Sequence, residues 1–209
     1  MYSPFKINEI MDSPSKLAIL RVFASHEGLK ATGREVANLT GYSVPSAHES
    51  LKDLLARNIL VREIIGRQHI YSLNEDDRIV QKIIRPMFEV ENNYKEEIRD
   101  LLLEEIERAG LKNTIVSLLL YGSVQKGTAN KSSDVDVAVV VAKSTDVDRV
   151  FEVFNSKIEE RFRAFFGLHL DFYLKPTAEF RKLLQKNSPP ISALMKSYSV
   201  LYGKEPLEV

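Results

Sequence analysis

Apolar residues in the first third of the chain recur at helical spacing. Ser13 can cap a helix that starts at Pro14, and its apolar positions stop at Gly28. Two further helices are predicted on either side of Gly41, the second of them capped by Ser43. The inner face of that second helix carries Ala47, Leu51, Leu54 and Leu55. These breaks predict three short helices in one unit.

The pattern then changes to strand alternation and back to helix. Residues 60–73 alternate apolar and polar side chains around Gly66 and Arg67, which predicts a β-hairpin. Residues 77–109 return to helical spacing, with a break at Pro86. This second segment predicts a helical connector. A solvated link, a dimer seam and a helix docked on its neighbour all fit its apolar stripe.

Strands and helices alternate after Gly110. Strands are predicted at 114–121, 133–141 and 168–174. A helix is predicted at 147–166, with Val147, Phe151, Phe154, Ile158 and Phe165 on one face. Pro176 opens another helix, and the last segment predicts a short helix that ends at Gly203. The alternation predicts a second domain built around a sheet.

Composition narrows the chemistry of the chain. The 209 residues, 44% of them hydrophobic, can form one medium domain or two small ones. Lys plus Arg equals Asp plus Glu at 29 each, so any contact with nucleic acid depends on a local patch. The absence of cysteine excludes disulfides, thiolate metal sites and cysteine nucleophiles. The four histidines are scattered, and no stretch has the roughly eighteen apolar residues of a membrane helix, so we expect a cytoplasmic protein without a zinc cage or a membrane anchor.

A glycine-rich turn followed by acidic residues stands out in "LLLYGSVQKGTANKSSDVDVAVVV", residues 118–141. Gly122 and Gly127 have the spacing of a P-loop, but Thr128 stands where the P-loop lysine would follow. A calcium loop is excluded because valine and alanine follow the two aspartates. The segment is therefore neither of these sites.

Two aspartates in the predicted strand point to a metal. Asp134 and Asp136 project from the same side of a strand, about 6 to 7 Å apart at their Cα atoms. A hard divalent ion such as Mg²⁺ removes the repulsion between carboxylates so placed. Asp171, on the polar face of a later strand, is a candidate third carboxylate, and three aspartates could hold two ions.

The glycine turn fits a phosphate ligand beside that metal. Gly122 has no side chain, so backbone amides at the start of the following short helix can approach a triphosphate. Ser123 adds a hydroxyl group, and Lys126 adds positive charge.

This turn and Asp-x-Asp strand resemble the signature of the polymerase-beta-like nucleotidyltransferase superfamily. The resemblance implies that Gly122 and Ser123 contact the nucleotide phosphates and that Asp134 and Asp136 bind magnesium. It also implies that Asp171 completes the site and activates the acceptor hydroxyl, with pyrophosphate as the leaving group. Lys126 departs from the family, whose minimal members commonly have arginine there; lysine keeps the charge and loses the bidentate fork.

Within this superfamily the chain is most similar to the minimal nucleotidyltransferases of prokaryotes. Some of these proteins serve as antitoxins that nucleotidylate a helical partner toxin, so a protein acceptor of that kind is one expected partner. The chain after Leu174 is too short for large helical additions that would position a tRNA end or an antibiotic. A protein side chain or a small molecule is therefore the expected acceptor.

The segment "GREVANLTGYSVPSAHESLKDLLARNILVREIIGRQHIYSLN" joins the predicted helix pair to the hairpin. This order resembles the winged helix-turn-helix of prokaryotic transcriptional regulators. The resemblance implies that the helix from Ser43 to Arg57 enters the major groove of DNA and that the hairpin is the wing. The implied DNA-binding residues are Arg34, Ser43, Ser46, His48, Lys52 and Arg67. Winged helices also serve dimerisation or protein docking, and Glu49 and Asp53 on the reading helix would repel phosphates.

Together these patterns predict an α/β (α+β) nucleotidyltransferase fold with a mixed sheet, preceded by a small winged helix-turn-helix domain. The expected domains are a DNA-binding domain at 1–76, a helical connector at 77–110 and a nucleotidyltransferase domain at 111–209. The expected reaction transfers a nucleoside monophosphate, AMP from ATP, to an acceptor hydroxyl with magnesium. The alternative is a non-catalytic DNA-binding regulator whose second domain binds nucleotide or mediates dimerisation; a homodimer is compatible with both.

Overall fold

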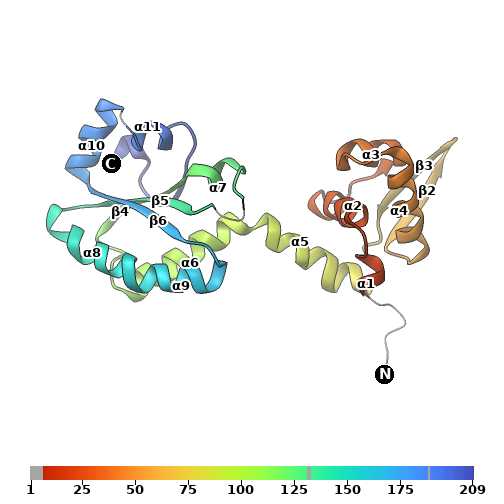
Figure 1. Cartoon of the computed structure of the whole chain (residues 1–209), viewed down its shortest axis with the longest axis horizontal. Coiled ribbons are helices and arrows are strands. Elements are labelled where there is room, and N and C mark those ends of the chain that lie inside the picture. Colours follow the sequence, from red (N-terminus) through yellow and green to blue (C-terminus); the bar gives the residue numbers. More distant parts are fainter. Residues whose placement is uncertain (1–6, 131–132, 188) are drawn as a thin grey trace, which may run out of the picture. The chain divides into compact units, whose positions relative to one another are not determined.

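The structure of the protein is a computed structural model that describes residues 7–130, 133–187 and 189–209. The chain divides into two compact units, Met1–Tyr94 and Lys95–Val209 (Figure 1). Each unit has a sheet and a buried core of its own. Among the described residues, no helix is long and apolar enough to cross a membrane.

The first unit combines short helices with a small antiparallel sheet. Its elements are α1 (Ile7–Ile10), α2 (Pro14–Ser25), β1 (Ala31–Thr32), α3 (Gly33–Thr40), α4 (Val44–Ala56), β2 (Leu60–Ile65), β3 (Gln68–Leu73), a π-helical turn (Val80–Ile84) and α5 (Arg85–Asn92). Strand β3 lies between β1 and β2 and pairs antiparallel with both. The helix pair α3–α4 followed by the hairpin β2–β3 is the winged helix-turn-helix arrangement, so the predicted fold of this unit is confirmed.

Local sequence signals fix where the helices of this unit begin. The Ser13 hydroxyl accepts a hydrogen bond from the Lys16 amide at 3.3 Å, which caps α2. The Ser43 hydroxyl accepts one from the Ser46 amide at 3.4 Å, which caps α4. Helix α3 starts with a capping box between Thr32 and Glu35. These interactions satisfy backbone donors that a helix cannot satisfy itself, so the helix starts predicted at Ser13 and Ser43 are confirmed.

The predicted connector contributes to both cores. Its first half buries Ile79, Val80, Ile84 and Phe88 in the core of the first unit. Its second half is α6 (Tyr94–Arg108), which buries Ile98, Leu101, Leu102 and Ile106. The boundary between the compact units therefore falls inside the segment that was expected to link two domains. The apolar side chains of this segment are buried both before and after the boundary. The expected domain limits, at residues 76 and 110, stay a prediction.

The second unit is built on a mixed four-stranded sheet. Its strands are β4 (Ile115–Tyr121), β5 (Val135–Val141), β6 (Leu170–Pro176) and β7 (Ser199–Gly203). Their order is β6-β5-β4-β7, with β5 and β6 parallel and the other two pairs antiparallel. The predicted mixed sheet is confirmed. Strands β4 and β5 are buried along almost their whole length, which explains their continuous apolar sequence.

Helices cover both faces of this sheet. They are α6, α7 (Gly122–Lys126), α8 (Val147–Val153), a π-helical turn (Phe154–Ile158), α9 (Glu159–Phe166), α10 (Thr177–Lys186) and α11 (Ile191–Leu194), with 3₁₀ turns at Ser144–Asp146 and Pro206–Glu208. Figure 1 shows α6, α8 and α9 on one face and α7, α10 and α11 on the other. The second face has a core that includes Leu119, Ala138, Phe180 and Leu194.

The last predicted helix is wrong over half of its length. Helix α11 ends at Leu194, and Ser199–Gly203 is instead the edge strand β7, paired with β4. Gly203 has a φ of +80°, and a Cβ there would lie 2.0 Å from the carbonyl oxygen of Val116. The glycine thus serves the close approach of β7 to β4 and does not end a helix.

The apolar face predicted for residues 147–166 is correct at Phe154 and Ile158 and wrong at Phe151 and Phe165. Phe151 and Phe165 were expected to face inward, but their side chains are 49% and 55% exposed. The buried positions are Val150, Phe154, Ile158 and Phe162, which recur every four residues. The π-helical turn at Phe154–Ile158 supplies this wider spacing, because its turn holds more residues than an α-helical turn.

Candidate functional site

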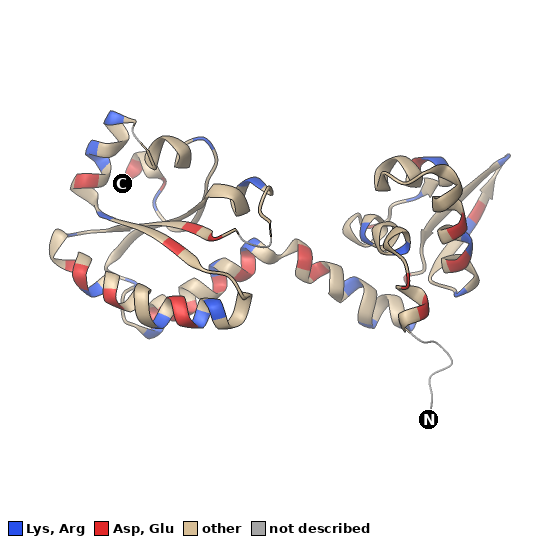
Figure 2. Ribbon diagram, viewed as in Figure 1, with Lys and Arg blue, Asp and Glu red and all other residues tan. Residues whose placement is uncertain are grey.

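Three strand positions meet in one row across the sheet of the second unit. Tyr121, at the end of β4, pairs with Asp136 of β5, and Asp136 pairs with Asp171 of β6. Adjacent strands lie about 4.8 Å apart, so the two aspartates are direct neighbours on parallel strands. Figure 2 shows acidic segments in red side by side on β5 and β6. Asp134 lies immediately before β5. Strand register thus brings the expected metal ligands together at one end of the strands.

The turn after β4 closes over Asp136. Gly122 has a φ of +77°, and a Cβ at this position would lie 1.9 Å from Oδ2 of Asp136. The next backbone amide, of Ser123, donates a hydrogen bond to the Asp136 carboxylate. The space left by the missing side chain of Gly122 is therefore filled by Asp136. The turn and the acidic strand form one site.

Negative charge accumulates at this site. Burial, together with the charges of Asp171 and Asp134, raises the pKa of Asp136 above its ordinary value. The Ser123 amide and the charge of Lys126 act in the opposite direction and are outweighed. Any positive charge placed beside the ionised carboxylate of Asp136 therefore stabilises it.

The residues present fit a magnesium ion, although the structure does not hold a complete cage for it. Among the described residues, no group of three or more His, Cys, Asp or Glu side chains is arranged to hold a metal ion. Asp134, Asp136 and Asp171 are therefore neighbours without being a preformed three-ligand site. Magnesium in proteins is commonly held by one or two carboxylates together with substrate phosphates and water. The facing pair Asp136 and Asp171 supplies that kind of donor set.

Sequence reasoning did not assign Tyr121 to the site. Burial, followed by the charges of Asp136, Asp171 and Tyr173, raises the pKa of Tyr121 to about 12. The phenol stays neutral at physiological pH and adds no charge beside the carboxylates. Its position directly before Gly122 was visible in the sequence, but only the register of β4 on β5 places it opposite Asp136.

Five of the six expected DNA-binding residues fall into two groups, the first of which surrounds a basic pocket. Arg34, His48 and Arg67 line a pocket of about 390 Å³ between α3, α4 and the wing, together with His69 and Gln68. Neither Arg34 nor Arg67 forms an ion pair with a described residue, whereas Arg21, Arg57 and Arg85 are each paired with a glutamate. Among the described residues that line this pocket, none is acidic. Unpaired positive charge therefore gathers on the wing side of α4.

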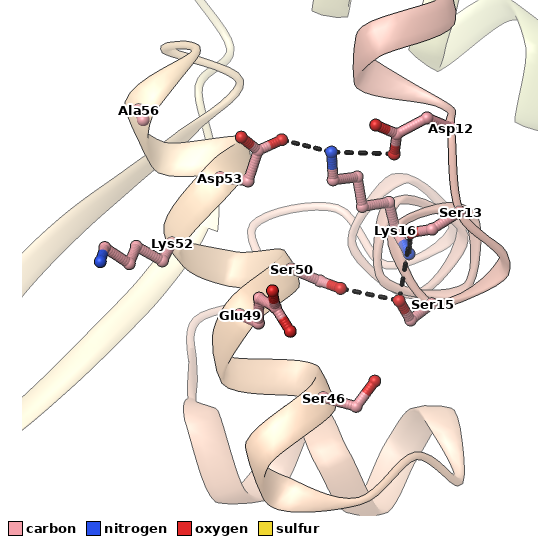
Figure 3. A pocket seen from close by; sticks show the side chains of 10 residues that line it. All are labelled: Asp12, Ser13, Ser15, Lys16, Ser46, Glu49, Ser50, Lys52, Asp53 and Ala56. Carbon is pink, nitrogen blue, oxygen red and sulfur yellow. Dashed lines mark hydrogen bonds and ion pairs between the residues drawn. The ribbon is translucent and has the colours of Figure 1, made fainter.

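The second group lies on the opposite side of α4. Ser46 and Lys52 line a pocket of about 730 Å³ that is shared with Glu49 and Asp53 (Figure 3). Lys16, whose side chain is 8% exposed, forms ion pairs with Asp53 and Asp12. The side chains on this face are thus of mixed charge, and Lys16, Asp12 and Asp53 are paired with each other. Lys52 forms no ion pair with a described residue and points away from that cluster.

Ser43, the remaining expected contact, is engaged elsewhere. Its hydroxyl accepts the capping hydrogen bond from the Ser46 amide. The side chain of Ser43 therefore already has a structural role, because it caps the start of α4. A role for Ser43 in contacting DNA stays a prediction.

Comparison with known proteins identifies the second unit. Residues 99–197 match the family model described as "Nucleotidyltransferase domain". The second unit thus carries a nucleotidyltransferase domain, preceded in the chain by a winged helix-turn-helix. No curated protein matches the sequence.

Several solved structures resemble parts of the chain. A predicted DNA-binding transcriptional regulator from E. coli is 15% identical, with a TM-score of 0.35, over 42% of this chain and 84% of that chain. The homodimeric winged helix-turn-helix DNA-binding domain Mb0332 from Mycobacterium bovis is 16% identical, with a TM-score of 0.33, over 44% and 76%. A toxin-antitoxin with AMP-PNP is 16% identical, with a TM-score of 0.33, over 51% and 74%. At these scores the likenesses add nothing to the fold assignment, which rests on element order, strand pairing and the family match.

Proposed function

We propose that the second unit transfers a nucleoside monophosphate, AMP from ATP, to an acceptor hydroxyl with Mg²⁺ as cofactor. The observation that carries this proposal is the convergence of Gly122, Ser123, Asp136 and Asp171 at one end of strands β4, β5 and β6. Paired carboxylates beside a glycine turn suit metal-assisted phosphoryl chemistry. The family match over residues 99–197 supports the same reaction class.

Each residue of the site has a proposed role. Asp134, Asp136 and Asp171 would hold the magnesium, which when bound supplies positive charge against the triphosphate. The hydroxyl of Ser123 would bind a phosphate oxygen, while its backbone amide holds Asp136. Lys126 would add charge without a bidentate fork. Gly122 would leave room for Asp136 to reach the metal and the phosphates.

Asp171 is the proposed base. It is exposed, and β6 is an edge strand, so an acceptor can reach it from solvent. Its carboxylate would take the proton of the acceptor hydroxyl while that oxygen forms a bond to the α-phosphorus of ATP. The bond from the α-phosphorus to the bridging oxygen then breaks, and pyrophosphate leaves.

The acceptor that we propose is a hydroxyl of a partner protein, such as a helical toxin. This proposal rests on the resemblance to the minimal nucleotidyltransferases. A small-molecule hydroxyl is the competing acceptor, and we propose action in the cytoplasm in either case.

The decisive experiment follows the α-phosphate. The full chain is incubated with Mg²⁺ and nucleotides labelled at the α-phosphate, alone and with candidate acceptors. Transfer of label that disappears in the Asp134→Asn plus Asp136→Asn variant supports the reaction. Asp148→Asn, which changes an exposed aspartate of α8, is the matched control and should transfer label normally. If calorimetry detects neither ATP binding nor an effect of Mg²⁺, the enzyme proposal is rejected.

A second function is favoured by the basic pocket of the first unit. We propose that Arg34, His48 and Arg67 bind DNA phosphates and base edges, with Ser43, Ser46 and Lys52 of the reading helix as further contacts. A chain that binds DNA and nucleotide but transfers no label would be a regulator, and its second unit could then also serve a homodimer. Gel retardation at several salt concentrations measures the DNA contribution separately from transfer.

A further inference from the structure

Helix α7 carries the phosphate-facing part of the proposed site and is too short to be stable alone. It spans only Gly122–Lys126, and Val124 is its one buried side chain. An isolated helical turn is unstable in water because nucleation is unfavourable. Its position must therefore be fixed by contacts with neighbouring elements, and the hydrogen bonds of Gln125 are two of these contacts.

Gln125 connects α7 to two other elements. The hydroxyl of Ser199, the first residue of β7, donates a hydrogen bond of 2.9 Å to Oε1 of Gln125. The Nζ of Lys95, in the first turn of α6, donates one of 2.9 Å to the backbone oxygen of Gln125. Both hydrogen bonds are partly buried, so water competes with them less than at an open surface. One residue thus anchors α7 through its side chain and its backbone.

Strand pairing explains why Ser199 can reach this turn. Ser199 lies beside Leu120 in the pairing of β7 with β4, and Leu120 is two residues before the start of α7. The edge strand therefore begins next to the turn that follows β4. The Lys95 bond reaches an oxygen near the C-terminal end of α7, where helix carbonyls lack partners within the helix and favour a cation.

We propose that Gln125 is a positioning residue for nucleotide binding, held by Ser199 and Lys95, and that it keeps Ser123 and Lys126 oriented toward the carboxylates. This inference rests on the proposed nucleotidyltransferase function. Gln125 does not touch the reacting atoms; it acts through the position of α7. Ser199 and Lys95 belong to the same device, although they are distant from the glycine turn in sequence.

The first test measures the position of α7 without using activity. Amide hydrogen exchange of residues 122–128 is followed in the full chain by mass spectrometry. Gln125→Ala and Ser199→Ala should each accelerate exchange in this segment, and Ser199→Thr, which keeps the hydroxyl, should restore the wild-type rate. Ser197→Ala, in the loop before β7, is the matched control. Unchanged exchange in both alanine variants would overturn the proposal.

The second test separates binding from chemistry. Loss of one such hydrogen bond should raise the KM for ATP by about three- to tenfold and leave kcat within about twofold, because a displaced α7 weakens phosphate binding equally in the ground state and the transition state. Lys95→Met should raise KM in the same way, and Lys95→Arg should recover most of the loss. The Gln125→Ala plus Ser199→Ala variant should be no worse than Gln125→Ala alone, since both changes remove one interaction.

The outcomes distinguish this inference from the proposed function. If the wild-type chain neither binds ATP nor transfers label, the proposed function fails, and the exchange rates alone decide whether Gln125 positions α7. If the wild-type chain is active but the double variant shows the product of the two single effects, Gln125 and Ser199 act independently and the inference is wrong.

Discussion

Gly122 and Asp136 occupy space that only one of them can fill with a side chain. A Cβ at position 122 would lie 1.9 Å from Oδ2 of Asp136, far inside van der Waals contact. Gly122→Ala should therefore displace the carboxylate, in addition to straining a backbone with a φ of +77°. A misplacement of about 1 Å can reduce catalysis by about 100-fold, and we expect a loss of that order in kcat/KM.

Gly127→Ala separates these two effects. Gly127 has a φ of +69°, but a Cβ there would meet no atom of a described residue within 4 Å. This variant should lose about 1–2 kcal/mol of stability from the backbone alone and keep most of its activity. Thermal unfolding and label transfer are measured for both variants. Equal activity losses at the two positions would show that the contact with Asp136 is not the cause.

Removing a negative charge at Asp136 should stabilise the second unit while abolishing its chemistry. The carboxylate is destabilised by burial and by Asp171 and Asp134, so Asp136→Asn should unfold at a higher temperature than the wild type at pH 7 without divalent ions. Asp148→Asn serves as the control and should leave the melting temperature nearly unchanged.

Magnesium should reverse this order of stability. A ligand that binds only the folded state stabilises it by about 2.7 kcal/mol at a concentration 100 times Kd. Addition of Mg²⁺ with a non-hydrolysable ATP analogue should therefore raise the melting temperature of the wild type and not that of Asp136→Asn. Equal shifts in both proteins would argue against Asp136 as a ligand.

The first unit should lose stability in acid through Asp53. Burial opposes ionisation of Asp53, but hydrogen bonds from Lys16 and Arg57 outweigh it and lower the pKa of the carboxyl below its ordinary value. Because the folded-state pKa is lower than the unfolded-state value, Asp53 stabilises the fold above pH 3.8 and loses this effect as pH falls through the folded-state pKa. Asp53→Asn should be less stable than the wild type at pH 7, and the difference should vanish in acid. Denaturant titrations at several pH values measure it.

DNA binding should depend more on the wing side of α4 than on its other side. Arg34→Glu and Arg67→Glu remove unpaired cations and should weaken binding in retardation assays, each lowering the salt slope by about 1. Lys52→Glu should have a smaller effect because Glu49 and Asp53 line the same pocket. Lys82→Glu, an exposed lysine of the π-helical turn before α5, is the control. Binding that is insensitive to both arginine variants would refute the DNA interface proposed for the basic pocket.

Local signals predicted the parts of the fold that depend on neighbouring residues in sequence. The caps at Ser13 and Ser43 and the hairpin around Gly66 were recognisable because their interactions span only a few residues. Strand β7 was not, since its extended state depends on pairing with β4, which is distant in the chain. The buried face of residues 147–166 was predicted only in part, at Phe154 and Ile158, because a π-helical turn changes the period of the helix.

In the candidate site, too, local features were predictable from sequence and features that depend on strand pairing were not. The spacing of Gly122, Asp134 and Asp136 was enough to predict a turn and an acidic strand in one site. The neighbourhood of Asp171 depends on the parallel register of β5 and β6, which the sequence does not encode locally. The contribution of Gln125 was hidden for the same reason, because its partner Ser199 lies in the strand that was predicted as a helix.

The close approach of Gly122 to Asp136 also constrains how this sequence can diverge. A descendant that keeps the carboxylate cannot accept any side chain at position 122, whereas one that has lost it is free to gain alanine or serine there. The residue at position 122 therefore indicates whether the carboxylate at position 136 has been kept. A homologue with a residue larger than glycine at this position would be a candidate for a domain that has lost catalytic activity and kept its fold.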